Sequence, residues 1–528
     1  WIYVRQDFGR YVQNFQAFDA TAQSLDVSRL KINTWSVSLG TGNSVRVEYD
    51  VDQTEPRLFG PVVNSSFAYV DGAMNFMFIQ DWTHLPAKVD FQVPHGWKLA
   101  TAMPPAEASF EFSVLNYDHL IDCPVYMSKF KEFYFTLKKR PFYVIFNKTA
   151  GIDVNNLLIM IKRIADYQLK FYNEIPFNNY FFMCYIDDNG IGGSGLEHRN
   201  STYLNFSKQF IRENLKLAAN IIAHEFFHVW NIKRFYPNNF GFCDYSTEKK
   251  TRDLWFSEGV TSYYADLTLL RAQIWSEQEF LSHLENMIEE LQENDDRLKT
   301  SVEMASWNAW GNGYHSDGVS YYTKGQLIGL LLDLTIREKT NNEKSLDDLM
   351  RFMNWWFGKT NQGFEEGDIL RAINALCYQD FTEFYERYVR GTEELPYTKI
   401  FTYAGISCDI EQDTLADLGQ VQITGEENIV ISIDEDGPLA RAGLKIGDRI
   451  KSIHGISVID AFSIPKIEVS LNINETIKIE AERKGLPMTL YATIGAKEKI
   501  NVALGFVQDA SNRQKEIRST WLSGISAN

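Results

Sequence analysis

The hydrophobic pattern changes character twice along the chain. Up to about residue 145, short segments alternate apolar with polar residues and are rich in β-branched and aromatic side chains. Examples are Ser44–Val51, Ala73–Ile79 and Ala108–Val114. Gly, Pro and Asn separate these segments at short intervals, as is typical of strands joined by tight turns. The pattern predicts a β-sandwich-like domain over residues 1–145.

From about residue 153, apolar residues recur at helical spacing. A short apolar strand, Tyr180–Ile186, runs into the glycine-rich segment Gly190–Gly195. Helical patterns then dominate to about residue 395. The predicted helices are Val154–Leu169, Ile211–Trp230, Leu254–Leu270, Phe280–Leu291, Tyr321–Arg337 and Leu346–Phe357. We therefore predict a mixed α/β domain over residues 146–400, mostly helical from about residue 265.

The remainder returns to strand-like patterns with turn residues between them. The predicted strands are Val421–Ile423, Ile429–Ile433, Arg449–Ile453 and Ile477–Ala481. A helix, Gln514–Leu522, is expected near the end. These patterns predict a small β-rich module over residues 405–500 and a helical tail over 501–528. The whole chain is thus expected to be a multidomain α+β protein.

Composition limits the classes of protein. Hydrophobic residues make up 45% of the 528 residues and charged residues 23%, which excludes a mainly disordered chain. The formal net charge of −17 argues against a nucleic-acid-binding protein, because phosphates require a basic surface. The cysteines lack the C-x-x-C spacing of a zinc ribbon and do not suggest a disulfide framework. They are Cys123, Cys184, Cys243, Cys377 and Cys408.

No apolar run reaches the ~18 residues that a membrane-spanning helix needs, so we expect a soluble protein with no transmembrane segment. The sequence starts at Trp1 rather than Met, and we expect its natural N-terminus to be absent. Whether the protein is cytoplasmic or exported to a periplasm does not follow from these residues.

The most specific chemical signal is His224-Glu225-Phe226-Phe227-His228. It lies in an apolar segment without Gly or Pro, which predicts a helix. On a helix, residues four apart share one face, so both imidazoles can reach one metal ion. Glu225 lies beside them, where a carboxylate can accept a proton from the attacking water. Such a motif would arise by chance on the order of once in a hundred chains, so a third ligand is needed to decide.

Glu258 is the candidate for that third ligand. It lies in the apolar segment Leu254–Tyr264, which predicts that its side chain points inward. A buried carboxylate is costly unless it is paired or binds a metal, although a lone glutamate early in a helix is more often exposed. His224, His228 and Glu258 would form a His₂Glu site for one zinc ion per chain, with a position left open for water.

Two segments, His224–Arg234 (H-E-F-F-H-V-W-N-I-K-R) and Leu254–Tyr264, resemble the glycyl aminopeptidase family of zinc peptidases that carry a PDZ domain. That family is related to thermolysin and to aminopeptidase N. The resemblance extends from the N-terminal β domain, through Tyr117-Asp118 and Asp122-Cys123-Pro124, to the C-terminal module. It implies a thermolysin-like catalytic domain between the N-terminal β domain and a C-terminal PDZ domain.

The segment Gly193–His198 (G-S-G-L-E-H) resembles the glycine–glutamate segment of aminopeptidase N-like enzymes. Taken alone, it reads as a glycine-rich loop with a solvated glutamate. The resemblance implies that Glu197 grips the free α-amino group of the substrate, with Gly195 lining the same site. A fixed carboxylate suits that task because it pairs with a cation. His198 stands where those relatives have an asparagine.

A second segment, Val319–Gly325, resembles the Tyr-x-Lys-Gly segment whose tyrosine hydroxyl points at the developing oxyanion. Alignment on Lys324-Gly325 assigns that role to Tyr322, with Tyr321 as the competitor. The alternative is that both tyrosines are core aromatics at the head of an amphipathic helix.

The segment Gly437–Ile450, followed by Ile453-His454-Gly455, resembles a bacterial-type PDZ domain. Such domains bind extended chain ends by adding a strand beside a sheet edge. Leu418 and Gly419 are the candidates for its carboxylate-binding loop. The competing interpretation is a module that only packs as a scaffold.

Together these features predict a zinc-dependent aminopeptidase that hydrolyses the first peptide bond of peptides with a free N-terminus. A preference for small N-terminal residues such as Gly or Ala is implied by the resemblance alone. The alternatives are a zinc endopeptidase, which would share every metal ligand, and a non-catalytic peptide-binding protein that uses the PDZ domain.

Overall fold

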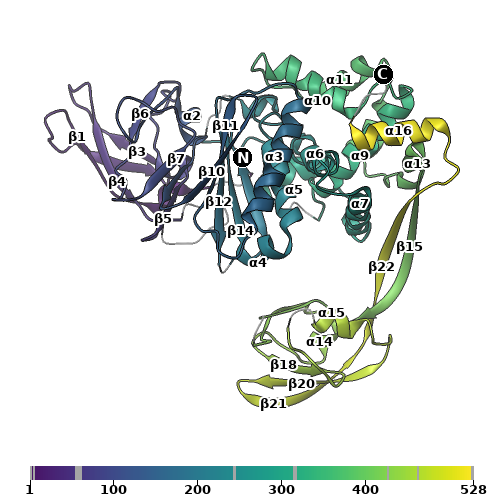
Figure 1. The fold of residues 1–528 in the computed structure, drawn as a ribbon. Coiled ribbons are helices and arrows are strands. Elements are labelled where there is room, and N and C mark those ends of the chain that lie inside the picture. The colour runs from purple at the N-terminus through teal and green to yellow at the C-terminus, as the bar shows by residue number, and fades with distance from the viewer. Residues whose placement is uncertain are drawn as a thin grey trace. The chain divides into compact units, whose positions relative to one another are not determined.

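The chain forms two compact units in a computed structural model (Figure 1). The first comprises Trp1–His283, Asp295–Ile406 and Phe506–Asn528, and the second comprises Leu284–Asn294 and Ser407–Gly505. The structure describes residues 3, 6–53, 62–188, 190–241, 245–312 (311 and 312 by backbone alone), 318–424, 427–460 and 463–524. Both units combine helices and strands, so the predicted multidomain α+β class is confirmed.

The N-terminal part of the first unit is β-rich, as predicted. Its described strands form small antiparallel sheets in the orders β1-β4, β2-β3, β5-β9-β7 and β6-β8. Most of these strands have only four to seven residues, too short for the two broad facing sheets that the prediction of a sandwich implies. The strands are β1 (Val12–Phe18), β2 (Val27–Lys31), β3 (Thr34–Val37), β4 (Arg46–Val51), β5 (Phe67–Val70), β6 (Ala87–Asp90), β7 (Lys98–Thr101), β8 (Glu111–Val114) and β9 (Val125–Ser128).

A mixed five-stranded sheet follows, in the order β10-β11-β12-β14-β13. Strands β11, β12 and β14 run parallel, and the hairpin partners β10 and β13 are antiparallel to their neighbours. Its strands are β10 (Lys131–Leu137), β11 (Arg140–Phe146), β12 (Tyr180–Asp187), β13 (Gly193–Glu197) and β14 (Ser201–Ser207). The β10–β11 hairpin thus belongs to this sheet. The predicted boundary at residue 145 divides the sheet, because the hairpin pattern alone does not reveal which sheet it joins.

The N-terminal strands pack on this sheet through a shared aromatic core. The Tyr69 and Tyr203 rings stack with centroids 3.8 Å apart, and the Tyr126 hydroxyl donates to the Cys184 carbonyl at 2.9 Å. Two short helices, α1 (Gly72–Asn75) and α2 (Tyr117–Ile121), lie among the N-terminal strands. The packing brings the end of α2, and with it Asp122, close to Lys233 of the helical part.

The predicted helices are present with small shifts at their ends. Asn214 divides the segment predicted as one helix over Ile211–Trp230. The described helices of the first unit, predicted or not, are α3 (Val154–Phe171), α4 (Lys208–Glu213), α5 (Leu215–Phe227), α6 (Val260–Arg271), α8 (Val302–Asn312), α9 (Thr323–Lys339), α10 (Leu346–Met353), α11 (Asp368–Cys377), α12 (Thr382–Phe384), α13 (Tyr397–Phe401) and α16 (Asn512–Ser523). Helix α7 (Glu277–Gln292) contributes to both units. Three π-helical turns, Trp255–Gly259, Asn354–Gly358 and Tyr385–Val389, adjoin these helices.

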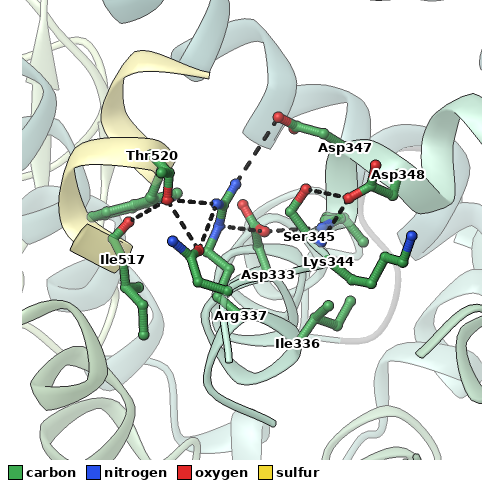
Figure 2. Close-up of polar contacts among 12 residues, drawn as sticks. Asp333, Ile336, Arg337, Lys344, Ser345, Asp347, Asp348, Ile517 and Thr520 are labelled. Carbon is green, nitrogen blue, oxygen red and sulfur yellow. Dashed lines mark hydrogen bonds and ion pairs between the residues drawn. The ribbon is translucent and has the colours of Figure 1, made fainter. Parts of the chain in front are cut away.

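The terminal helix α16, yellow in Figure 1, packs on α6 and α9 within the first unit. Trp521 is fully buried there, and its indole Nε1 donates to the Tyr263 hydroxyl at 2.7 Å. Figure 2 shows the Arg337 guanidinium of α9 between Asp333 and Thr520, at 3.0 Å from each. Helix α16 therefore closes the helical part of the first unit. The predicted helical tail begins only after β22 ends.

The second unit holds a compact apolar core of its own, with Leu418, Val430, Ile450 and Ile479 fully buried. Its sheets have the orders β15-β22, β16-β17 and β19-β18-β20-β21. The elements are β15 (Ile406–Asp417), β16 (Val421–Ile423), β17 (Val430–Ile433), α14 (Pro438–Arg441), β18 (Arg449–Ile453), β19 (Ile456–Ser457), α15 (Ser463–Glu468), β20 (Thr476–Arg483), β21 (Leu486–Thr493) and β22 (Gly495–Phe506).

Three glutamates, two on α7 and Glu293 just after its end, accept hydrogen bonds from β22 inside the second unit. Glu285, Glu289 and Glu293 accept from the backbone N–H groups of Leu504, Val502 and Ile500 at 2.8, 2.9 and 3.3 Å. The carboxylates recur every fourth residue of the helix and the amides every second residue of the strand. We name this arrangement the glutamate ladder.

Among the described helices, none is long and apolar enough to cross a membrane. Cys123, Cys184 and Cys377 are buried thiols. Cys243 lies outside the described residues.

We predict that Trp521→Ala will destabilise the first unit, because it removes a fully buried indole and its hydrogen bond to Tyr263. The loss should be about 3–5 kcal/mol, visible as a lower melting temperature in thermal denaturation. Trp355→Ala is the matched control, since that side chain is 56% exposed. Equal melting temperatures for the two variants would contradict the role assigned to α16.

Candidate metal centre

Helix α5 presents both histidines of the H-E-x-x-H motif on one face. Its alanines and Ile222 are buried and it contains no Gly or Pro, which favours a helix in this segment. His224 lies in its last turn, and His228 is its C-terminal cap. The four-residue spacing brings the ring centroids within 4.6 Å of each other.

Glu258 comes from the π-helical turn that precedes α6 and is buried. A π-helical turn leaves backbone carbonyls without their usual helical partners. The buried Asn231 side chain supplies a donor: its Nδ2 lies 2.9 Å from the Phe256 carbonyl and 2.9 Å from Thr261 Oγ1. Asn231, which lies just after His228, therefore connects this segment to the turn that carries Glu258.

Three ligand atoms converge between these elements. His224 Nε2 lies 3.0 Å from His228 Nε2, and Glu258 Oε2 lies 3.2 Å from each of the two nitrogens. A tetrahedral zinc ion with bonds of about 2.0 Å would separate its ligand atoms by about 3.3 Å. The observed triangle therefore fits one zinc ion.

The hydrogen bonds of the outer ring nitrogens set the tautomers. His228 Nδ1 lies 2.9 Å from the Asn231 carbonyl, which can only accept, so Nδ1 carries the proton. Ser262 Oγ donates to the Glu258 carbonyl at 3.0 Å, which leaves it to accept from His224 Nδ1 at 3.2 Å. In the neutral imidazoles, both Nε2 atoms then present lone pairs. Two lone pairs and a carboxylate oxygen facing one another need a cation, and the donor set suits zinc.

Glu225 lies beside this triangle and is almost completely buried. Its Oε2 has no hydrogen-bond partner among the described residues. Burial raises the pKa of the Glu225 carboxyl, and the charges of Glu197 and Glu258 add to the shift. Gly195 on β13 makes room for the side chain, because a Cβ there would lie 2.3 Å from Glu225 Cγ. A larger residue at position 195 would thus displace the Glu225 side chain.

Glu197, the last residue of β13, is brought to the same site. Its carboxylate, that of Glu225 and the His228 imidazole have ligand atoms within 4.8 Å of one another. Lys233 Nζ lies 3.8 Å from Glu197 Oε1 and 3.0 Å from Asp122 Oδ1. Burial opposes ionisation of Glu197, but nearby cationic groups, including Lys233, lower its pKa. The side chain is therefore not the solvated glutamate of the alternative interpretation.

The two candidate tyrosines differ in position. The Tyr322 ring lies beside the His224 ring, with their centroids 6.0 Å apart, and is partly exposed. Tyr321 is buried against the ring of Tyr3. A close crossing sets this arrangement, because a Cβ on Gly259 would lie 2.6 Å from the Gly325 Cα. The geometry therefore favours Tyr322 over Tyr321.

Several residues of the site are absent from the sequence-based predictions. The Tyr3 hydroxyl donates to Glu258 Oε1 at 2.6 Å, so both carboxylate oxygens of Glu258 are engaged. Asn231, Ser262 and Lys233 hold the metal-facing groups through the bonds described above. Lys233 carries a signal in the sequence, since a lysine after Trp230 and Ile232 stands in an apolar run.

The candidate carboxylate loop of the second unit is already bonded internally. The Leu418 N–H donates to Glu468 Oε1 at 2.8 Å, and the Gly419 N–H donates to Asp417 Oδ1 at 2.9 Å. Lys497 Nζ pairs with the other Glu468 oxygen at 2.6 Å. The Leu418 side chain is part of the core of the unit. The two amides that would receive a chain-end carboxylate are thus occupied by carboxylates of the same chain.

The sequence matches known families in two places. Residues 218–328 match the M61 glycyl aminopeptidase family, and residues 2–129 match the M61 peptidase N-terminal domain. The first match includes His224, His228, Glu258 and Tyr322. These matches define the chain as a protein of the peptidase class. More closely, the two matched stretches are similar to the M61 glycyl aminopeptidase family.

The fold also occurs in solved structures. An aminopeptidase N family protein from Idiomarina loihiensis is 24% identical and superposes with a TM-score of 0.85, over 98% of this chain and 93% of that chain. A two-domain M1 zinc metallopeptidase bound to L-arginine is 12% identical and covers 73% of this chain and 85% of that one, with a TM-score of 0.45. A DegP-like periplasmic serine endoprotease from Pseudomonas putida is 32% identical over 77 residues, which is 15% of this chain and 16% of that protein.

We predict that zinc affinity falls with decreasing pH. Burial opposes protonation of His228, but Glu258 and other carboxylates outweigh it and raise the pKa of His228 to about 9. Below that pH, a zinc ion must displace the proton, so affinity should fall about tenfold per pH unit between pH 8 and 6. Competition with a chelating dye measures this dependence. Glu225→Gln is the control, because it removes the titrating Glu225 carboxyl and keeps the three metal ligands. The same pH dependence should persist in this variant. An affinity that does not change with pH would contradict the prediction.

Proposed function

We propose that the protein is a zinc-dependent aminopeptidase with one zinc ion held by His224, His228 and Glu258. The convergence of two Nε2 lone pairs and Glu258 Oε2 within 3.2 Å of one another carries this proposal. Glu225 and Glu197 lie beside that triangle. The family match supports the class of reaction.

The zinc ion, when bound, supplies a Lewis acid that polarises the scissile carbonyl and acidifies the attacking water. Glu225 accepts the proton of that water. The unsatisfied Glu225 Oε2 and the raised pKa of the carboxyl suit a group that takes a proton and later returns it to the leaving amine. The absence of a side chain at Gly195 leaves the space that the Glu225 side chain occupies.

Two further side chains complete the mechanism. The partly exposed Tyr322 donates its hydroxyl to the oxyanion that develops on the carbonyl. Glu197 binds the α-ammonium group of the substrate, which limits cleavage to the first peptide bond. The edge position of β13 in its sheet leaves Glu197 at the border of the site.

The finer features of the proposal rest on different grounds. The preference for N-terminal Gly follows the family description, and its extension to Ala is part of this proposal. The N-terminal β domain ends near residue 130, where the matched N-terminal domain ends and the mixed sheet begins. We propose that the PDZ-like module of the second unit does not capture chain ends at Leu418 and Gly419, because internal carboxylates already bond both amides.

We expect Glu225→Gln to lower kcat on glycyl and alanyl peptides by about 10²–10⁴-fold, because it removes the proton acceptor. Zinc content, measured by elemental analysis, should remain one per chain. A chelator should abolish the wild-type activity and added zinc should restore it. Full activity in the variant, or hydrolysis that a chelator does not affect, would contradict the proposal.

Glu197→Gln distinguishes an aminopeptidase from an endopeptidase. It keeps the shape of the side chain and removes the charge that pairs with the α-ammonium, so we expect KM for Gly-peptides to rise at least tenfold. Wild-type enzyme should hydrolyse these peptides and leave their N-acetylated forms intact. Cleavage of the acetylated peptides at wild-type rates would instead indicate the endopeptidase.

A further inference from the structure

Three charged side chains meet at the border of the candidate active site. Lys233 Nζ lies between Asp122 Oδ1, at 3.0 Å, and Glu197 Oε1, at 3.8 Å. The three side chains are only 7–13% exposed. They come from three separate parts of the chain: the end of α2, the end of β13 and the turn after α5. Buried charges at this spacing require one another, since each alone would be costly to desolvate.

The backbone is strained where it delivers Lys233. Ile232 has a φ of +101°, a conformation that β-branched residues rarely adopt. The Lys233 N–H donates to the His228 carbonyl at 3.1 Å, and Asn231 is bonded to the turn that carries Glu258. Such strain persists only where the surroundings impose it, and it is found most often at functional sites. The segment from His228 to Lys233 thus links the metal ligands to the lysine.

Asp122 has contacts beyond Lys233. Its Oδ2 accepts the Arg199 backbone N–H at 3.0 Å, and its Oδ1 lies 3.4 Å from His198 Nδ1. His198 Nε2 is buried and has no hydrogen-bond partner among the described residues. Both residues follow Glu197 in sequence, so Asp122 holds the segment just after Glu197 as well as the lysine beside it.

The charges determine what this cluster can bind. Lys233 alone beside Glu197 would cancel the charge that an α-ammonium group needs. Asp122 neutralises Lys233, and the three buried side chains together carry one net negative charge. The Arg199 Nε also lies 3.7 Å from Asp122 Oδ2, but that side chain is 59% exposed and solvent screens its charge. Burial opposes the charged form of Lys233, but Asp122 and Glu197 outweigh it and raise its pKa. The cluster therefore matches a ligand group with a single positive charge.

We propose that Lys233, neutralised by Asp122, is a positioning residue that orients the Glu197 carboxylate toward the α-ammonium group of the substrate. The inference rests on the proposed role of Glu197 and extends it to the two residues that fix its orientation and the charge of the pocket. Asp122, which belongs to the N-terminal β-rich part, thereby contributes to substrate recognition.

The test uses binding as well as turnover. In the Glu225→Gln background, calorimetry measures the affinity for Gly-Ala-Ala and for its N-acetylated form. Lys233→Met should weaken binding of the free-amine peptide at least tenfold and leave the acetylated peptide unaffected. Lys233→Arg should restore most of the affinity. In the otherwise wild-type enzyme, Lys233→Met should raise KM more than it lowers kcat, with zinc content unchanged.

Asp122→Asn tests separately whether the net charge of Asp122, Lys233 and Glu197 matters for binding. It leaves Lys233 uncompensated, so the free-amine peptide should bind more weakly by a similar factor although Glu197 and Lys233 are both present. Lys148→Met is the matched control, because Lys148 pairs with Asp188 at 2.6 Å outside the site. If Lys233→Met does not fold, Asp122→Asn and Lys233→Arg carry the test alone.

The outcomes separate the two proposals. If the wild-type protein binds free-amine and acetylated peptides equally, the role of Glu197 fails and the inference fails with it. If the wild-type protein discriminates but Lys233→Met and Asp122→Asn discriminate equally well, only the role of Lys233 and Asp122 is overturned. An equal loss of affinity for both peptides would indicate a merely structural role and would also overturn it.

Discussion

The close approach of three metal-facing atoms is the constraint on which the catalytic unit depends. His224 Nε2, His228 Nε2 and Glu258 Oε2 face one another at 3.0–3.2 Å, and hydrogen bonds on the far side of each imidazole prevent the rings from relaxing the arrangement by a change of tautomer. When both imidazoles are neutral, the packing of α5 against the π-helical turn holds these atoms together against their mutual repulsion, and below a pH of about 9 a proton on His228 relieves part of that repulsion. The fold thus holds the site ready for a cation, and binding of that cation stabilises the folded protein.

Much of this organisation follows from local sequence. The two histidines share a helix face because they are four residues apart, and the apolar surroundings of Glu258 correctly predict its burial. Long periodic segments such as α3 and α9 are equally clear. The β10–β11 hairpin was assigned to the wrong side of a boundary, because strand pairing across a domain border is decided by distant partners such as Tyr180–Cys184. The number and size of the N-terminal sheets depend on the same kind of distant pairing.

Other parts of the site could not be predicted from local patterns. Asp122 and Lys233 are separated by more than a hundred residues, and their ion pair exists only because the N-terminal strands pack on the mixed sheet. The positive φ of Ile232 is not encoded by a glycine and results from tertiary contacts. The different burial of Tyr321 and Tyr322 likewise results from tertiary packing, and a close approach of Gly259 and Gly325 occurs beside them. The resemblance suggests Tyr321 and Tyr322 as candidates, and their burial in the structure differs.

In the glutamate ladder, the spacing of the carboxylates along the helix differs slightly from the spacing of the amides along β22. Four residues of helix advance by about 6.0 Å and two residues of strand by about 6.6 Å, so successive rungs drift apart by about 0.6 Å. The bonds lengthen in the same direction, from 2.8 Å at Leu504 through 2.9 Å at Val502 to 3.3 Å at Ile500. Because the rungs occupy alternate amides of β22, those amides cannot recruit a strand from another molecule. Carboxylates thus protect this strand from intermolecular β-pairing.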